Sequence, residues 1–119
     1  MATEYLFVYG TLHPERAPAE MRPVVRRMTY LGPGEIEGVV HHLEGYPGLI
    51  LNRGPEAMVQ GSVFGLPDDP GVLEALDRYE DFRADDLAAS LFVRVKRAVR
   101  MGYGARLECW VYVYNREIP

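Results

Sequence analysis

Glycine interrupts several apolar segments of this sequence that would otherwise be expected to form regular strands. Gly38 lies within the segment 35–43, and Gly61 lies within the segment 58–66. A glycine inside a strand marks a bulge, a sharp bend or the close approach of another backbone. Repeated interruptions of this kind favour a strongly curved sheet or a closed barrel.

The order of the expected elements is about six or seven strands with one clear helix between them. The expected strands are rich in aromatic and branched residues and cover 4–9, 35–43, 49–51, 58–66, 90–99 and 106–114. Turns are expected at Gly32-Pro33-Gly34, at Tyr46-Pro47-Gly48 and at 101–104. The sequence therefore predicts an α+β fold, a small, mixed and mainly antiparallel β-barrel.

The clearest helix is the segment 67–82. Asp68 or Asp69 can cap its first turn, and Pro70 suits the first helical position. Its apolar residues recur at a spacing that makes one face: Val72, Leu73, Leu76 and Tyr79. A shorter helix is expected around 18–27.

The bulk properties narrow the classes of function. The 119 residues suit one domain over 1–119, and a net charge of −4 gives no general attraction to nucleic acid. No apolar run approaches the ~20 residues that span a membrane, and the first residues lack the positive charge of a signal peptide. With a single cysteine, Cys109, no internal disulfide can form. We expect a cytoplasmic protein, either a monomer or a homodimer.

Glu80 stands out among the charged residues of the main helix. It follows Leu73 by seven positions and Leu76 by four, which places it at the edge of the apolar face, whereas Asp77 is expected to lie mostly elsewhere. Partial desolvation raises the pKa of a carboxyl group and makes it a better general base. The alternative is that the helix has ended by residue 80 and that Glu80 is a solvated acid.

Other constellations of reactive side chains are weaker. His41 and His42 are adjacent, so in a strand they point to opposite faces and cannot share a metal ion. Ser62 and Ser90 lie in no nucleophile motif, and no phosphate-binding glycine motif is present. We expect no metal and no cofactor. One face of the last strand carries Trp110, Tyr112 and Tyr114. These side chains either pack in the core or present a tyrosine hydroxyl to a cavity.

Several of these segments together resemble the gamma-glutamylcyclotransferase-like family. The first strand ends in Tyr9-Gly10-Thr11-Leu12, which is similar to the family's Tyr-Gly-Thr/Ser-Leu turn. Four further segments resemble the family in the same order: GVVHHLEGYPGLIL (38–51), VQGSVFGL (59–66), LEALDRYEDF (73–82), and the hairpin of FVRVKRAV (92–99) with CWVYVYN (109–115).

This resemblance implies a barrel with a cavity at its mouth and an enzyme that cyclises a γ-glutamyl amine or amide. The substrate's own α-amine attacks its γ-carbonyl, so that 5-oxoproline forms and an amine leaves. The family's acid/base glutamate falls on Glu80, and its substrate-binding turn falls on Tyr9, Gly10, Thr11 and Leu12. Arg94, Tyr112 and Tyr114 are further candidates for the substrate pocket.

Two positions depart from the family pattern. Asp81 stands where the family often has glycine after the glutamate, and Phe92 replaces the tyrosine of a Tyr-x-Arg motif whose arginine is Arg94. The amine part of the substrate is left open. Two other classes of function also stay open: a non-catalytic module of the same fold that binds a small molecule, and an interaction domain that uses the aromatic hairpin.

Overall fold

The computed structural model describes residues 3–9, 17–43, 46–51 and 57–116. Its strands are β1 (Tyr5–Val8), β2 (Thr29–Leu43), β3 (Tyr46–Leu51), β4 (Met58–Gly65), β5 (Phe92–Met101) and β6 (Arg106–Tyr114). Its helices are the short η1 (Ala19–Met21), α1 (Arg22–Val25) and η2 (Leu87–Ala89), and the longer α2 (Pro70–Tyr79).

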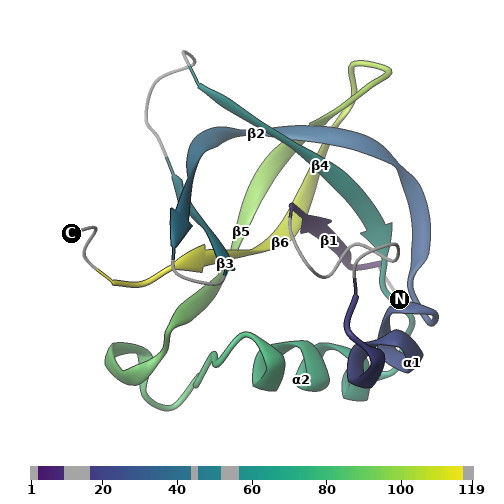
Figure 1. Ribbon diagram of the computed structural model, residues 1–119. Coiled ribbons are helices and arrows are strands. Elements are labelled where there is room, and N and C mark those ends of the chain that lie inside the picture. Colours follow the sequence, from purple (N-terminus) through teal and green to yellow (C-terminus); the bar gives the residue numbers. More distant parts are fainter. Residues whose placement is uncertain (1–2, 10–16, 44–45, 52–56, 117–119) are drawn as a thin grey trace.

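The strands form a closed barrel with one additional strand. Their order is β3-β2-β4-β1-β6-β5, and a further pairing between β2 and β5 closes the ring (Figure 1). Every pairing is antiparallel except that of β1 with β6, in which Leu6 lies opposite Trp110. The predicted α+β fold with a mixed, mainly antiparallel barrel is confirmed.

The barrel closes at a segment that the sequence predicted to be a turn. Gly32, Pro33 and Gly34 instead lie inside β2, next to an irregularity in its pairing with β4. A Cβ atom at Gly34 would lie 2.8 Å from Val99 Cγ1 and 3.0 Å from Val63 Cγ2. The turn prediction was wrong because glycine here permits the close approach of β5 rather than a reversal of the chain.

The second predicted turn, Tyr46-Pro47-Gly48, is also part of a strand. These residues begin β3, and Pro47 lies opposite His42 of β2. Proline cannot donate a backbone hydrogen bond, so it is confined to edge strands and irregular positions. β3 stands at one end of the strand order, and this explains why its proline is tolerated.

Two buried apolar layers follow from the alternation of side chains along the strands. One layer fills the barrel and includes Phe7, Val63 and Val111. The other lies between the outer wall of the barrel and the helices; its members come from β1, β4, β5 and β6 as well as from α1 and α2: Leu6, Val8, Val25, Phe64, Val72, Leu76, Phe92 and Tyr112.

Helix α2 runs across one end of the barrel wall and brings its last turn to β5 and β6 (Figure 1). Asp69 caps its first turn by accepting a hydrogen bond from the Gly71 N–H at 2.8 Å, with Pro70 at the first helical position, as predicted. Among the described residues, no helix has the length and apolar character needed to cross a membrane.

Candidate active site

The C-terminal turn of α2 fixes the backbone of Glu80. Glu80 N–H donates to the Leu76 carbonyl at 2.9 Å, Asp81 N–H to that of Arg78 at 3.2 Å, and Phe82 N–H to that of Asp77 at 2.9 Å. The last two bonds are those of a Schellman motif, in which the residue after the C-cap adopts a left-handed conformation. Asp81 is that residue, with φ of 55°.

The Glu80 side chain is partly buried, although the helix itself ends at Tyr79. Burial raises the pKa of its carboxyl group from 4.5 to about 7. Within the described residues, this carboxylate accepts no hydrogen bond and forms no ion pair. The helix therefore ends where the alternative interpretation had it end, but Glu80 is desolvated as the pattern of α2 predicted.

Tyr9 and Tyr112 lie in the electrostatic neighbourhood of Glu80. Burial raises the pKa of the Tyr9 hydroxyl, as it does for Tyr112, and the negative charge of Glu80 raises both further. The Tyr9 hydroxyl donates to the Tyr112 carbonyl at 2.6 Å and accepts from the Leu49 N–H at 3.2 Å. The end of β1 is thereby fixed to β6 and β3 beside the carboxylate.

A second carboxylate, Asp77, lies one turn before Glu80 and is fully engaged. Its Oδ1 and Oδ2 accept from Arg94 Nε at 2.8 Å and Nη2 at 3.2 Å. The Tyr112 hydroxyl donates to Asp77 Oδ1 at 2.7 Å. Arg94 and Tyr112 are opposite each other in the β5–β6 register, so this network joins the last turn of α2 to two strands.

The Arg94 guanidinium is also held by aromatic rings. Its Cζ lies 4.2 Å from the centroid of Trp110 and 5.4 Å from that of Phe82. Such cation–π contacts, together with a two-point bond to a carboxylate, fix a planar guanidinium in one orientation. Arg94 was predicted to lie in the substrate pocket; the structure pairs it with Asp77, one turn before Glu80, and its contact with a substrate stays a prediction.

Asp77 is the residue that the sequence reasoning missed, because the helical pattern was expected to carry it away from the apolar face. Its side chain is 19% exposed. One signal was present: Asp77 follows Leu73 by four positions and precedes Glu80 by three, so all three share a side of the helix. Its partner in β5 is not predictable from that spacing.

The remaining predicted site residues are Tyr114 and the turn at Gly10, Thr11 and Leu12. Tyr114 packs edge-on against Phe92, with ring centroids 5.7 Å apart. Phe92 is 5% exposed and belongs to the outer apolar layer. The predicted binding turn at Gly10, Thr11 and Leu12 lies outside the described residues. Within the described part of the chain, no cluster of three potential metal ligands is present.

Comparison with protein families matches residues 6–119 to the family described as gamma-glutamyl cyclotransferase, AIG2-like. The chain belongs to this family. The resemblance inferred from the sequence motifs is therefore confirmed. No curated protein matched the chain in a separate sequence comparison.

Several solved structures share the fold at low sequence identity. An AIG2-like protein from Mus musculus superposes with a TM-score of 0.74 and 22% identity, over 100% of this chain and 82% of that chain. A gamma-glutamyl cyclotransferase gives a TM-score of 0.69 and 14% identity, over 96% of this chain and 68% of the other. YkqA from Bacillus subtilis gives 0.70 and 16%, over 96% of this chain but only 36% of its own length.

The geometry explains one departure from the family pattern. The position after the glutamate has a positive φ, which glycine adopts without steric cost and which aspartate tolerates better than most residues. The Asp81 carboxylate pairs with Arg83 Nε at 3.2 Å, on the exposed side of the turn. The raised pKa of Glu80 comes from burial.

Proposed function

We propose that this protein is a cyclotransferase that converts a γ-glutamyl amine or amide into 5-oxoproline and a free amine, with Glu80 as general acid and base. The observation that carries the proposal is the state of Glu80. It is a partly buried carboxylate with a pKa of about 7 and no ion-pairing partner among the described residues. Family membership supports cyclotransferase chemistry, and no metal or cofactor is invoked.

The reaction requires one proton to move between two nitrogens. An α-amino group has a pKa of about 8, so near neutral pH it must lose a proton before it can attack. That first proton is released to solvent. As the neutral α-nitrogen then bonds to the γ-carbonyl carbon, Glu80 accepts the further proton that this nitrogen must lose. The same carboxyl group then returns the proton to the departing nitrogen as its bond to that carbon breaks. A group whose pKa lies near the working pH suits both transfers.

The surroundings of Glu80 suit this role. Because Tyr9 and Tyr112 are held by hydrogen bonds to backbone and to Asp77, the wall beside the carboxylate is rigid. Residues Gly10, Thr11 and Leu12 directly follow Tyr9, and we propose that their backbone N–H groups bind the substrate's carboxylate or the oxyanion of its γ-carbonyl. Arg94 binds Asp77, which in turn accepts the hydrogen bond of the Tyr112 hydroxyl.

The test is release of 5-oxoproline from a panel of γ-glutamyl amines and γ-glutamyl peptides. We expect at least one substrate to be turned over, and Glu80→Gln to reduce kcat about 10²- to 10⁴-fold, the usual contribution of a general acid or base. Glu74→Gln is the matched control, since it makes the same chemical change on an exposed position of α2 and should leave kcat unchanged.

Two outcomes contradict the proposal. Full turnover by Glu80→Gln would remove Glu80 from the acid/base role. Binding of γ-glutamyl amines without release of 5-oxoproline, by a folded wild-type protein across the panel, would instead favour the non-catalytic binding module.

A further inference from the structure

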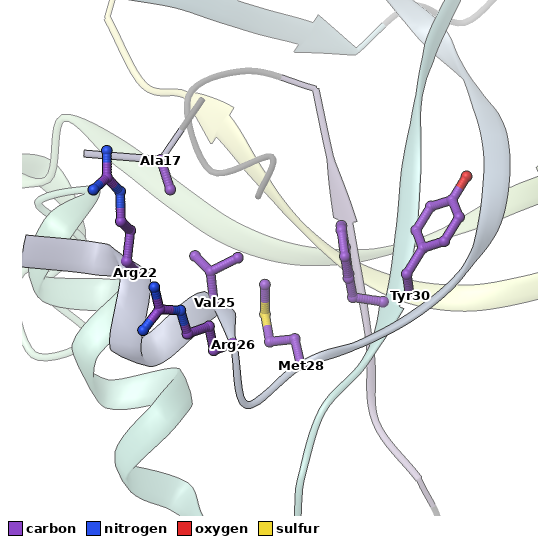
Figure 2. Close-up of a pocket in the computed structure, with 7 residues that line it drawn as sticks. Ala17, Arg22, Val25, Arg26, Met28 and Tyr30 are labelled. Carbon is purple, nitrogen blue, oxygen red and sulfur yellow. The ribbon is translucent and has the colours of Figure 1, made fainter. Parts of the chain in front are cut away.

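A pocket lies between α1 and the barrel wall. Its volume is about 550 Å³, within the range of pockets that enclose small organic ligands. Neither Glu80, Asp77 nor Tyr112 lines it. Figure 2 shows Arg22 and Arg26 on one side of this pocket and Tyr30 on the other, with Val25 and Met28 between them.

The inner surface of the pocket is apolar and aromatic. Val25, Met28 and Phe64 contribute to its lining and also belong to the outer buried layer, where they are 4%, 7% and 1% exposed. Tyr30 is 56% exposed and tilts over Phe64, with ring centroids 5.5 Å apart. A large exposed aromatic side chain beside a buried one offers a surface on which a flat apolar group can stack.

The rim carries two positive charges, those of Arg22 and Arg26. Arg22 and Arg26 are four residues apart, and Arg26 N–H donates to the Arg22 carbonyl at 3.0 Å, so both side chains leave one side of the same turn. Like charges at this spacing repel each other and destabilise a helix. Within the part of the chain that the structure describes, neither guanidinium forms an ion pair or a side-chain hydrogen bond.

Arg27, next to Arg26 in sequence, differs from the two rim arginines because it has an acidic partner. Arg27 points to α2 and forms an ion pair with Asp69, with Nη1 and Oδ2 2.5 Å apart. Glu20 lies within two residues of Arg22 in sequence but forms no ion pair with either rim arginine. An anion in the pocket would neutralise these two charges, which pair with no carboxylate among the described residues.

We propose that this pocket binds a small organic anion with an aromatic body, such as an aryl carboxylate, as a site independent of Glu80. The carboxylate lies between the guanidinium groups of Arg22 and Arg26, which can bind it through paired N–H donors. The aromatic body lies over Val25 and Met28 and stacks on Tyr30 and Phe64. The occupant is a small molecule because the apolar surface is recessed and only Tyr30 projects from it.

The experiment compares three probes of one shape that differ in charge: 2-naphthoate, 2-naphthamide and 2-naphthylmethylammonium. Titration calorimetry, or chemical-shift changes in NMR spectra of the whole chain, gives Kd for each. We expect 2-naphthoate to bind about tenfold more tightly than the neutral amide, since two exposed ion pairs contribute modestly, and the cation to bind most weakly.

Variants locate the site. The double variant Arg22→Ala and Arg26→Ala should reduce the affinity for 2-naphthoate to that for the amide, and Tyr30→Ala should weaken both probes. The matched control is Arg97→Ala with Arg106→Ala, which removes two arginines from a separate groove between β2 and β5. This control should leave binding unchanged.

Equal affinity for the anion and the amide, or binding that survives loss of both rim arginines, would overturn the proposal. Self-association of the chain that Arg22→Glu with Arg26→Glu abolishes, without any binding of 2-naphthoate, would show that the pocket is a protein contact instead. Release of 5-oxoproline reports on Glu80 separately, so failure of this site and failure of the proposed function are distinguishable.

Discussion

Two carboxylates lie one turn apart at the end of α2, and they differ in their hydrogen-bond and ion-pair partners. Asp77 is held by Arg94 on both oxygens and by the Tyr112 hydroxyl. Glu80 is also withdrawn from solvent, yet within the described residues it has no ion-pairing partner, and its pKa is raised to about 7. Burial is common to both; the presence of a cation separates them.

This contrast shows how a rigid support and a reactive group can be placed side by side. A buried carboxylate that is paired stays charged and joins elements together, whereas one that is unpaired becomes a stronger base near neutral pH. The Arg94 guanidinium of β5 pairs with Asp77, and within the described residues no cation pairs with Glu80.

The strongest way to break the comparison is to remove Asp77. We expect Asp77→Ala to lower the free energy of unfolding by about 3 kcal/mol, because it leaves the Arg94 guanidinium, 16% exposed, and the Tyr112 hydroxyl without their acceptor. Urea denaturation followed by circular dichroism measures this. Arg83→Ala is the control: it breaks the exposed pair with Asp81 and should change stability by less than about 0.5 kcal/mol.

An Asp77→Ala variant as stable as the wild type would contradict the structural role of the network. If stability falls while Arg83→Ala is also strongly destabilising, then burial does not separate the two ion pairs as the structure indicates.

The pH dependence of stability tests whether the Glu80 carboxyl group is desolvated in the folded protein. The folded-state pKa of about 7 lies above the value of 4.5 for an unperturbed glutamate, so between these values the folded protein binds more protons than the unfolded chain. Stability should therefore fall as pH rises from 4.5 to 7 and then level off. We expect the wild type to lose about 2 kcal/mol more than Glu80→Gln between pH 5 and pH 8.

Unfolding free energies of both proteins, measured by urea denaturation at the two pH values, give this difference directly. Other titrating groups contribute equally to both proteins and cancel. Parallel changes with pH in the wild type and Glu80→Gln would mean that Glu80 is not desolvated in the folded state.

The smallest expected effect concerns the turn that holds Glu80 in place. Asp81→Gly should stabilise the protein by about 0.5 kcal/mol, because relief of the positive φ outweighs the greater freedom of glycine in the unfolded chain. Asp85→Gly is the control. Asp85 is exposed and has no positive φ, so glycine there should be destabilising by a similar amount. Thermal denaturation measures the stability change of both variants. Destabilisation by Asp81→Gly would show that the positive φ of Asp81 does not strain the backbone.

The sequence predicted those features that depend on neighbouring residues. The cap at Asp69, the proline at the start of α2 and the two faces of β6 follow from local chemistry and from the alternation of side chains. Glu80 was found in the same way, because its desolvation follows from the apolar stripe of its own helix. Family motifs and the glycines within strands then indicated the barrel.

The features that could not be predicted depend on residues far apart in sequence. The composition of Gly32-Pro33-Gly34 is that of a turn. Only the pairing of this segment with β5, which closes the barrel, makes it part of a strand. The ion pair of Asp77 depends on a partner 17 residues away in another element. The pocket of Arg22 and Arg26 likewise requires Tyr30 and Phe64 to come together from two strands.

The position of β1 has a consequence for how the chain is made. β1 lies between β4 and β6, and the Tyr9 hydroxyl bonds to a carbonyl 103 residues later in the chain. While β6 is still within the ribosome, one edge of β1 has no partner, and unpaired edges invite association with other chains. β1 is thus completed by β6, which is synthesised much later, and the contact of Tyr9 with Tyr112 beside Glu80 can form only after β6 has emerged.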